Sequence, residues 1–281
     1  MQTKILFSAL VGLVACACAI PAGASVARTR HQHTRMTTNA AQVVVARGQS
    51  LEVAYMPDLT GQTSGFAPSI GNAVAMAVAA HPSVRGFPLR INVVDTPCGE
   101  GDAADLAAAT TAVVNTRNAA VIGPFCSTAD TVALPVFESA GLVTLSGSTT
   151  DPSLPQLGPD VYNSVDVSDS CCPYVDLSDP WYATVSTLPR DLAWRQAYTQ
   201  QFGAAPGEFA DLYYDATSLL IRTLQTTSSI DSRGDLVLNR AALAHAVRNT
   251  TNYPGVTCTV TLDPATGFRI NDPTALTRCA H

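Results

Sequence analysis

The sequence predicts an α/β fold in which a doubly wound parallel sheet forms one large lobe. From residue 51 onward, short apolar and β-branched runs alternate with longer runs in which apolar residues have helical spacing. The middle helical run is rich in alanine, which favours a helix on intrinsic propensity. Right-handed crossovers would bring the strands into one sheet covered by helices. The expected strands are 51–55, 89–94, 119–122 and 142–145, and the expected helices between them are 69–80, 103–116 and 128–140.

The pattern changes after Asp151, where clusters of Pro, Ser and Asp predict loops and turns instead of a buried strand. Helices are expected again at 189–202, 209–225 and 240–248, and the last two runs have apolar residues at helical spacing. The chain then has two short β-rich runs, 256–262 and 268–270, on either side of a turn at 263–267. These two runs predict a β-hairpin.

The first 24 residues have the features of an export signal, with Lys4 followed by an apolar run over 5–15. This run is shorter than the roughly 20 apolar residues that a membrane-spanning helix needs. Two processing routes stay open: Cys16 would carry a lipid anchor if 13–16 acts as a lipobox, or A-x-A cleavage would follow Ala24. Residues 25–50 would then form a tether. We expect secretion to the periplasm or the cell surface, with or without the anchor.

Length and charge indicate how many domains the chain can form and which kind of ligand it can bind. The part that follows the signal is long enough for one large domain or two small lobes. The formal net charge of −6 and the isoelectric point near 5.2 argue against nucleic-acid binding, which depends on clustered Lys and Arg. The only lysine, Lys4, lies in the expected signal. A small-molecule ligand therefore fits the composition better than a nucleic acid does.

Cysteine usage indicates disulfides, because an exported chain with eight cysteines enters an oxidising compartment. Two of the eight, Cys16 and Cys18, fall in the signal region. The other six show no C-x-x-C spacing, which argues against zinc or redox chemistry; they are Cys98, Cys126, Cys171, Cys172, Cys258 and Cys279. Cys258 and Cys279 can tie the expected hairpin to the chain end. Adjacent Cys171 and Cys172 would form a strained mutual bridge or stay free.

Short motifs of polar and turn-forming residues follow the expected strands and helices in a definite order. The first half carries Asp58-Leu59-Thr60-Gly61, Val94-Asp95-Thr96-Pro97-Cys98, Val121-Ile122-Gly123-Pro124-Phe125-Cys126-Ser127 and Ser146-Gly147-Ser148-Thr149-Thr150-Asp151-Pro152. The second half carries Phe202-Gly203-Ala204-Ala205-Pro206, Tyr214-Asp215-Ala216 and Tyr253-Pro254-Gly255-Val256-Thr257. In this order and spacing, the motifs resemble the leucine/isoleucine/valine-binding family of substrate-binding proteins for ABC importers, which has the type I periplasmic binding-protein fold.

The resemblance implies two βα lobes that are joined by three crossings and hold a ligand in the cleft between them. It also implies that a late helix, at 213–225 here, packs on the first sheet. The family inserts most of its second lobe where this chain has only a short link between Val165 and Trp181. We therefore expect a truncated second lobe. The expected first lobe is 51–165 with 207–254, and the expected remnant of the second is 166–206 with 255–281.

Candidate ligand-binding residues follow two expected strands, because ligands of doubly wound sheets bind beyond the carboxyl ends of the strands. Ser127 begins a helix that it can cap, and the free N–H groups there favour an anion. The loop after the next strand adds Ser148, Thr149 and Thr150. The resemblance implies that Ser127 and Thr150 hydrogen-bond the α-carboxylate of an amino acid, with backbone groups of the other two contributing.

A purely structural interpretation of these residues stays open. Ser127 with Asp130 three residues later is an ordinary capping arrangement, and Ser and Thr are common turn formers. The family has a small apolar residue where Ser148 and Thr149 stand, so the ligand can differ. The resemblance further implies a disulfide between Cys98 and Cys126 that would hold the loop presenting Ser127.

An amino-acid ligand also needs an acceptor for its ammonium group, because an unpaired charge removed from water costs several kcal/mol or more. In the family the second lobe supplies this acceptor, and that lobe is shortened here. Four residues of the link can substitute for it, although they also fit a solvated loop: Tyr174, Asp176, Asp179 and Trp181.

The sequence favours a protein without catalytic activity. It contains no G-x-S-x-G, H-E-x-x-H, P-loop or G-x-G-x-x-G motif, and Asp102 with Asp105 fits first-turn helix acids better than an acid/base pair. We expect no cofactor and no metal. The main hypothesis is capture of a small polar solute, an amino acid in the first instance, for an ABC permease. The alternatives are a sensory or partner-binding module of the same fold and a decayed remnant that binds nothing.

Overall fold

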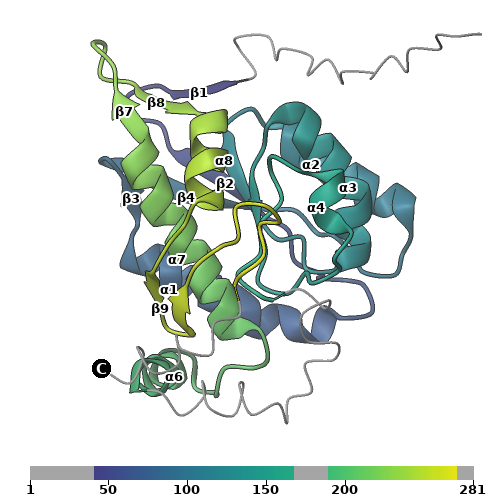
Figure 1. The fold of residues 1–281 in the computed structure, drawn as a ribbon. Coiled ribbons are helices and arrows are strands. Elements are labelled where there is room, and N and C mark those ends of the chain that lie inside the picture. Colours follow the sequence, from purple (N-terminus) through teal and green to yellow (C-terminus); the bar gives the residue numbers. More distant parts are fainter. Residues whose placement is uncertain (1–40, 168–188, 271–281) are drawn as a thin grey trace, which may run out of the picture. The chain divides into compact units, whose positions relative to one another are not determined.

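Five strands form the central sheet in the computed structural model, which describes residues 41–167 and 189–270 (Figure 1). They are β2 (Leu51–Tyr55), β3 (Ser83–Val84), β4 (Phe87–Val93), β5 (Asn118–Ile122) and β6 (Thr144–Leu145), in the order β3-β4-β2-β5-β6. β2 pairs in parallel with β4 and β5, and β5 pairs in parallel with β6. Only the short β3 is antiparallel to its neighbour within this sheet. The predicted parallel sheet is therefore confirmed, with β2 at its centre.

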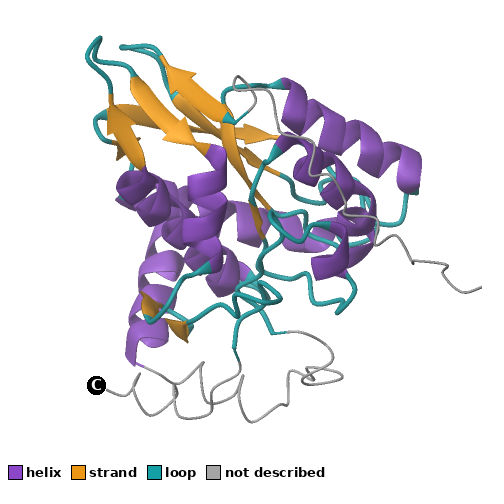
Figure 2. Cartoon of the chain, turned by 45° about the horizontal axis from the view of Figure 1, so that its top comes forward, coloured by secondary structure: helices purple, strands orange, loops and turns teal. Residues whose placement is uncertain are grey.

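Helices cover both faces of this sheet (Figure 1 and Figure 2). On one side lie α2 (Asp102–Val114), α3 (Ser127–Ala140) and the short α4 (Leu154–Leu157); on the other lie α1 (Ala67–Ala80), α7 (Ala210–Thr227) and α8 (Arg240–Arg248). A short 3-10 turn, η1 (Ser64–Phe66), leads into α1. β2 alternates between the two cores: Val53 and Tyr55 face α1 and α7, whereas Ala54 and Met56 face α2 and α3. The expected packing of the late helix, α7, on the first sheet is confirmed.

A second, antiparallel sheet has the order β1-β8-β7 and consists of β1 (Gln42–Val45), β7 (Ser228–Ile230) and β8 (Leu236–Asn239). β1 lies within the range that we expected to be a tether. Val43 and Val45 of this strand are both 2% exposed and belong to the core beneath α7 and α8. The tether prediction is therefore wrong for residues 42–45, because a four-residue strand is too short to show clear periodicity.

Two further segments extend the first lobe instead of forming part of a second one. Trp194 and Tyr198 of α6 (Pro189–Phe202) pack with Ala73 of α1 and Ala210 of α7. The hairpin of β9 (Tyr253–Gly255) and β10 (Cys258–Val260) joins α7, where the Asp215 carboxylate accepts two backbone N–H bonds from the residues that connect these strands. All described residues belong to one compact unit.

The predicted C-terminal hairpin is confirmed only at its turn. Leu262 and Arg269 form an antiparallel bridge, and the Asp263 N–H donates to the carbonyl of Phe268 at 2.8 Å. Residues 258–260, however, pair with 253–255 and not with 268–270. Among the helices of the described residues, none is long and apolar enough to cross a bilayer.

Buried and exposed side chains alternate along β1, so substitutions there can test whether the strand packs on the core. We expect Val43→Ala and Val45→Ala each to lower the free energy of unfolding by about 1 to 3 kcal/mol, because each removes buried methyl groups. The neighbouring Val44 is 47% exposed, so Val44→Ala should change it by less than about 0.5 kcal/mol. Denaturant unfolding of the three variants measures the differences. Equal, small effects at all three positions would show that β1 does not dock.

Candidate functional site

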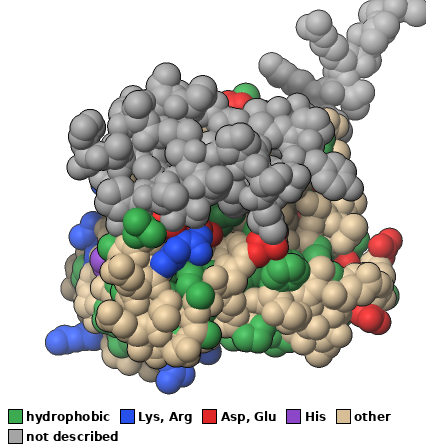
Figure 3. All heavy atoms as spheres, turned by 90° about the horizontal axis from the view of Figure 1, so that it is seen from below, with side chains coloured by type: hydrophobic (Ala, Val, Ile, Leu, Met, Phe, Trp, Pro, Cys, Tyr) green, Lys and Arg blue, Asp and Glu red, His purple; other side chains and the backbone are tan. Residues whose placement is uncertain are grey.

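Loops that follow the parallel strands meet at the carboxyl edge of the sheet. The Thr96 N–H donates to the Pro57 carbonyl at 2.8 Å, and the Gln62 N–H donates to the Cys98 carbonyl at 3.0 Å. These bonds join the loops after β2 and β4. Figure 3 shows the molecule from below; on the part of this face that is not drawn in grey, basic side chains are scattered and do not gather into one patch.

The structure brings together Ser127 and Thr150, the two residues predicted to hold a carboxylate. The Thr150 N–H donates to the Ser127 hydroxyl oxygen at 3.2 Å, and both side chains are half-buried at the strand edge. The predicted capping role of Ser127 is wrong, since Cys126 is the N-cap residue and no side chain caps α3. The first turn of α3 therefore keeps N–H groups that no capping side chain satisfies, beside two hydroxyls.

Ser148 and Thr149 direct their side chains inward, away from Ser127. The Ser148 hydroxyl donates to the Phe125 carbonyl at 2.7 Å, which links the loop after β6 to the loop after β5. The Thr149 side chain is fully buried, and its carbonyl accepts a 2.8 Å bond from the Tyr162 hydroxyl. The Ser148 side chain therefore has a structural role and the Thr149 side chain is buried, so a contribution of either residue to ligand binding would come from a backbone group.

Tyr213 of α7 supports both loops from below, a role that the sequence analysis missed. Its hydroxyl donates to the Pro124 carbonyl at 3.3 Å and lies 3.0 Å from the Ser148 hydroxyl oxygen. A Cβ atom at Gly147 would lie 2.7 Å from the Tyr213 ring, so only glycine allows this close approach. Burial raises the pKa of Tyr213 to about 12, which keeps its hydroxyl protonated as a donor. The signal in the sequence was Gly147 itself, between the polar residues of the loop.

Asp130 lies on the first turn of α3 but takes no part in a capping arrangement with Ser127. Its side chain is fully buried, and neither carboxyl oxygen has a hydrogen-bond partner; the buried Thr149 hydroxyl has none either. Burial raises the pKa of Asp130 to about 8, and the nearby Thr149 hydroxyl opposes this shift only in part. Asp130 is therefore mostly neutral at pH 7, directly beneath the candidate site.

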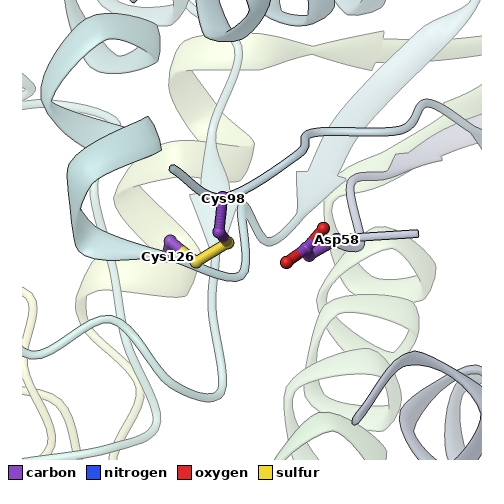
Figure 4. A group of neighbouring side chains, drawn as sticks. All are labelled: Asp58, Cys98 and Cys126. Carbon is purple, nitrogen blue, oxygen red and sulfur yellow. A yellow bond between two sulfur atoms is a disulfide. The ribbon is translucent and has the colours of Figure 1, made fainter. Parts of the chain in front are cut away.

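A disulfide joins Cys98 and Cys126, with the Cα atoms 6.1 Å apart, as the resemblance implied. Asp58 lies beside it, and one ligand atom of each of the three residues falls within 4.8 Å of the others (Figure 4). The two sulfur atoms are bonded to each other, so no thiolate is present for a metal. The Asp58 carboxylate instead accepts backbone bonds from Gly61 at 2.6 Å and Thr63 at 2.7 Å. This group holds the loop after β2 in place.

Three phenylalanines form an apolar wall beside the candidate site. Phe66, Phe125 and Phe209 pack with ring centroids 5.6 to 5.8 Å apart, and Phe125 directly precedes Cys126. Phe209 has a φ of 63°, which is costly for a bulky residue and is maintained only by its surroundings. Phe66 and Phe209 are only half-buried, so the wall offers apolar surface near the uncapped helix end.

Several predicted residues fall outside the described residues. These are the possible lipid anchor Cys16, the pair Cys171 and Cys172, Cys279 as the expected partner of Cys258, and the substitutes for an ammonium acceptor, Tyr174, Asp176, Asp179 and Trp181. Their assignments stay predictions.

The disulfide should contribute measurably to stability. The bridge closes a loop over a separation of 28 residues, so replacing both cysteines by alanine should lower the free energy of unfolding by about 3 kcal/mol. Denaturant unfolding of the wild type and the double variant under identical oxidising conditions measures this difference. Alkylation followed by mass spectrometry should find neither cysteine free in the wild type. A free thiol at either position would contradict the assignment.

Asp130 should make stability depend on pH with a definite sign. Its pKa is higher in the folded state than the ordinary value of 3.8, so the folded protein binds this proton more tightly than the unfolded chain. The free energy of unfolding should therefore fall as pH rises from about 4 to 8. Between pH 5 and 8, titration of Asp130 should lower the free energy of unfolding by on the order of 3 kcal/mol. Asp130→Asn should lack this decrease.

Unfolding experiments at several pH values measure the effect, with Asp102→Asn as the control. Asp102 is an exposed acid in the first turn of α2, where its charge raises the pKa of Asp105; its replacement should leave the contribution of Asp130 to the pH dependence intact. Parallel curves for the wild type and Asp130→Asn would contradict the prediction.

Comparison with known proteins gives results for structure only. No family model matches the sequence, and no curated protein matches it significantly. Among solved structures, the leucine-binding protein LivK of Thermotoga maritima matches with a TM-score of 0.64 and 14% identity, over 78% of this chain and 93% of that chain. A substrate-binding protein of an ABC transporter from Desulfitobacterium hafniense, in complex with leucine, matches with a TM-score of 0.63 and 17% identity, over 80% and 96%.

A third similar structure has a different ligand. It is a solute-binding protein of an ABC transporter from Rhodopseudomonas palustris in complex with 3,4-dihydroxybenzoic acid, with a TM-score of 0.63 and 12% identity, over 79% of this chain and 91% of that chain. Identities this low show the fold alone. The chain thus has the α/β fold of the substrate-binding proteins of ABC importers, the type I periplasmic binding fold that its motifs resemble.

Proposed function

We propose that this chain is an extracytoplasmic solute-binding protein that captures a small carboxylate-bearing ligand, an amino acid in the first instance, for delivery to an ABC permease. The observation that carries the proposal is the position of Ser127 and Thr150, side by side at the uncapped N-terminus of α3. A helix N-terminus with free N–H groups attracts negative charge, and two adjacent hydroxyls add donors. The fold supports the proposal, because ligands of such sheets bind at the carboxyl edge.

The function requires binding and release without a covalent step. A serine nucleophile needs an adjacent base to take its proton, but the Ser127 hydroxyl oxygen accepts its bond from the backbone N–H of Thr150. The nearby acid, Asp130, is buried and mostly neutral at pH 7. The arrangement therefore suits recognition of an anion better than catalysis.

The wall of Phe66, Phe125 and Phe209 favours a ligand with an apolar body behind its carboxylate. Leucine and 3,4-dihydroxybenzoic acid, which two similar structures hold, both have this shape. The carboxylates of Asp58 and Asp95 both accept bonds from the loop after β2, Asp58 from Gly61 and Thr63 and Asp95 from Leu59 and Thr60, so both already serve to hold that loop. Aromatic and aliphatic monocarboxylates are therefore the second ligand class, beside amino acids.

A thermal-shift screen of the mature, oxidised protein tests the proposal. The panel pairs branched-chain amino acids with the 2-oxo acids of the same carbon skeleton, and adds benzoate and its hydroxylated derivatives. A ligand present at 100 times its dissociation constant should stabilise the native state by about 2.7 kcal/mol, or about 5 to 10 °C in melting temperature. A larger shift with the amino acid than with its 2-oxo acid would show that the protein recognises the ammonium group.

The double substitution Ser127→Ala with Thr150→Ala should abolish the shift, because it removes both hydroxyls at the helix end. Ser139→Ala is the matched control, since it removes an exposed serine from the other end of the same helix. A shift that survives the double substitution would place the site elsewhere. A cooperative melt that no member of the panel moves would refute small-carboxylate capture.

A further inference from the structure

Asp130 is a buried acid that the fold does not neutralise with a partner. Both carboxyl oxygens lack hydrogen bonds, and the neighbouring Thr149 hydroxyl is likewise without a partner. An ionised carboxylate in such a place would cost several kcal/mol, because the Thr149 hydroxyl beside it offsets only part of the lost hydration. Leucine at this position would carry no such cost, so packing alone does not require an acid here, which points to a use for its charge.

The groups around Asp130 all belong to the loops of the candidate site or to the residues that support them. The Thr149 hydroxyl lies next to the carboxyl group of Asp130. A charge on Asp130 raises the pKa values of the Tyr162 and Tyr213 hydroxyls. Tyr162 holds the Thr149 carbonyl, and Tyr213 lies against the Ser148 hydroxyl. The second acid in this neighbourhood, Asp166, acts on Tyr162. Burial and the Thr149 hydroxyl are the two influences on the protonation of Asp130 itself.

A charge on Asp130 would also act on the ligand directly. Asp130 lies on the same first turn of α3 as Ser127, the turn whose free N–H groups attract an anion. A negative charge buried there would cancel part of that attraction, and the low local polarity would transmit it with little screening. It would also disturb the loop 148–150, because its nearest polar neighbour is Thr149.

We propose that Asp130 sets the charge selectivity of the strand-edge site: the site takes the carboxylate of a ligand while Asp130 is neutral, and ionisation of Asp130 releases it. This inference rests on the proposed function, since it assigns the regulation of the same site. Burial places the titration near pH 8, so the site accepts an anion in neutral and acidic media and loses it in alkaline media. By reciprocity, anion binding near this pH draws a proton onto Asp130.

Binding isotherms for benzoate and for L-leucine between pH 6 and 9 test the inference. We expect the wild type to lose affinity for benzoate roughly tenfold over this range, as a buried charge near the anion predicts. Asp130→Asn cannot ionise, so its affinity should stay level across the range. Asp102→Asn, in the corresponding turn of α2, should follow the wild type.

Proton uptake by the wild type gives a second measurement that needs no variant. Calorimetric titration of benzoate at pH 8, in two buffers with different ionisation enthalpies, should show uptake of a fraction of one proton per ligand. Absence of uptake, or a fall in affinity that Asp130→Asn shares with the wild type, would overturn the role of Asp130 while leaving the proposed function intact. Failure of both probes to bind at every pH would instead overturn the site itself, and this inference with it.

Discussion

The packing of Tyr213 beneath the carboxyl edge of the sheet is the contact on which the candidate site depends. Its ring fills the space that the missing side chain of Gly147 leaves, and its hydroxyl bonds the Pro124 carbonyl beside Ser148. A residue of α7 thereby holds the loops after β5 and β6, and those loops place Thr150 against Ser127. The site therefore depends on contacts between chain segments more than 60 residues apart.

Much of the fold follows from local patterns. The strand β2 and the helices α6 and α8 begin and end at the predicted residues. In α8 the buried Leu243, Ala244 and Val247 have helical spacing, which is a clear local signal. The strands β1, β7 and β8 could not be found in this way, since each has only three or four residues and depends on its partners. The pairing of β10 with β9 depends likewise on Asp215, whose carboxylate draws the connecting residues onto α7.

The candidate site likewise has features that local sequence predicts and features that depend on distant residues. That Ser127 and Thr150 would meet was predictable, because both follow neighbouring parallel strands at one edge. The inward turn of Ser148 and Thr149 was not, because the partners that hold them, Tyr162 and Tyr213, come from other parts of the chain. The burial of Asp130 was hidden for a similar reason: a helix pattern identifies a first-turn acid but not the loop that covers it.

The buried arginines explain why the charge state of a single acid would matter so much here. Arg240 donates to the carbonyls of Asn118 and Ala140, Arg248 to that of Tyr162, and Arg269 to those of Thr257 and Thr259. These three cations therefore hold the ends and turns of the chain together. In the proposed site, helix N–H groups and hydroxyls would hold the carboxylate, and they attract an anion more weakly than a guanidinium does. One negative charge on the first turn of α3 would then offset much of that attraction and favour release of the ligand.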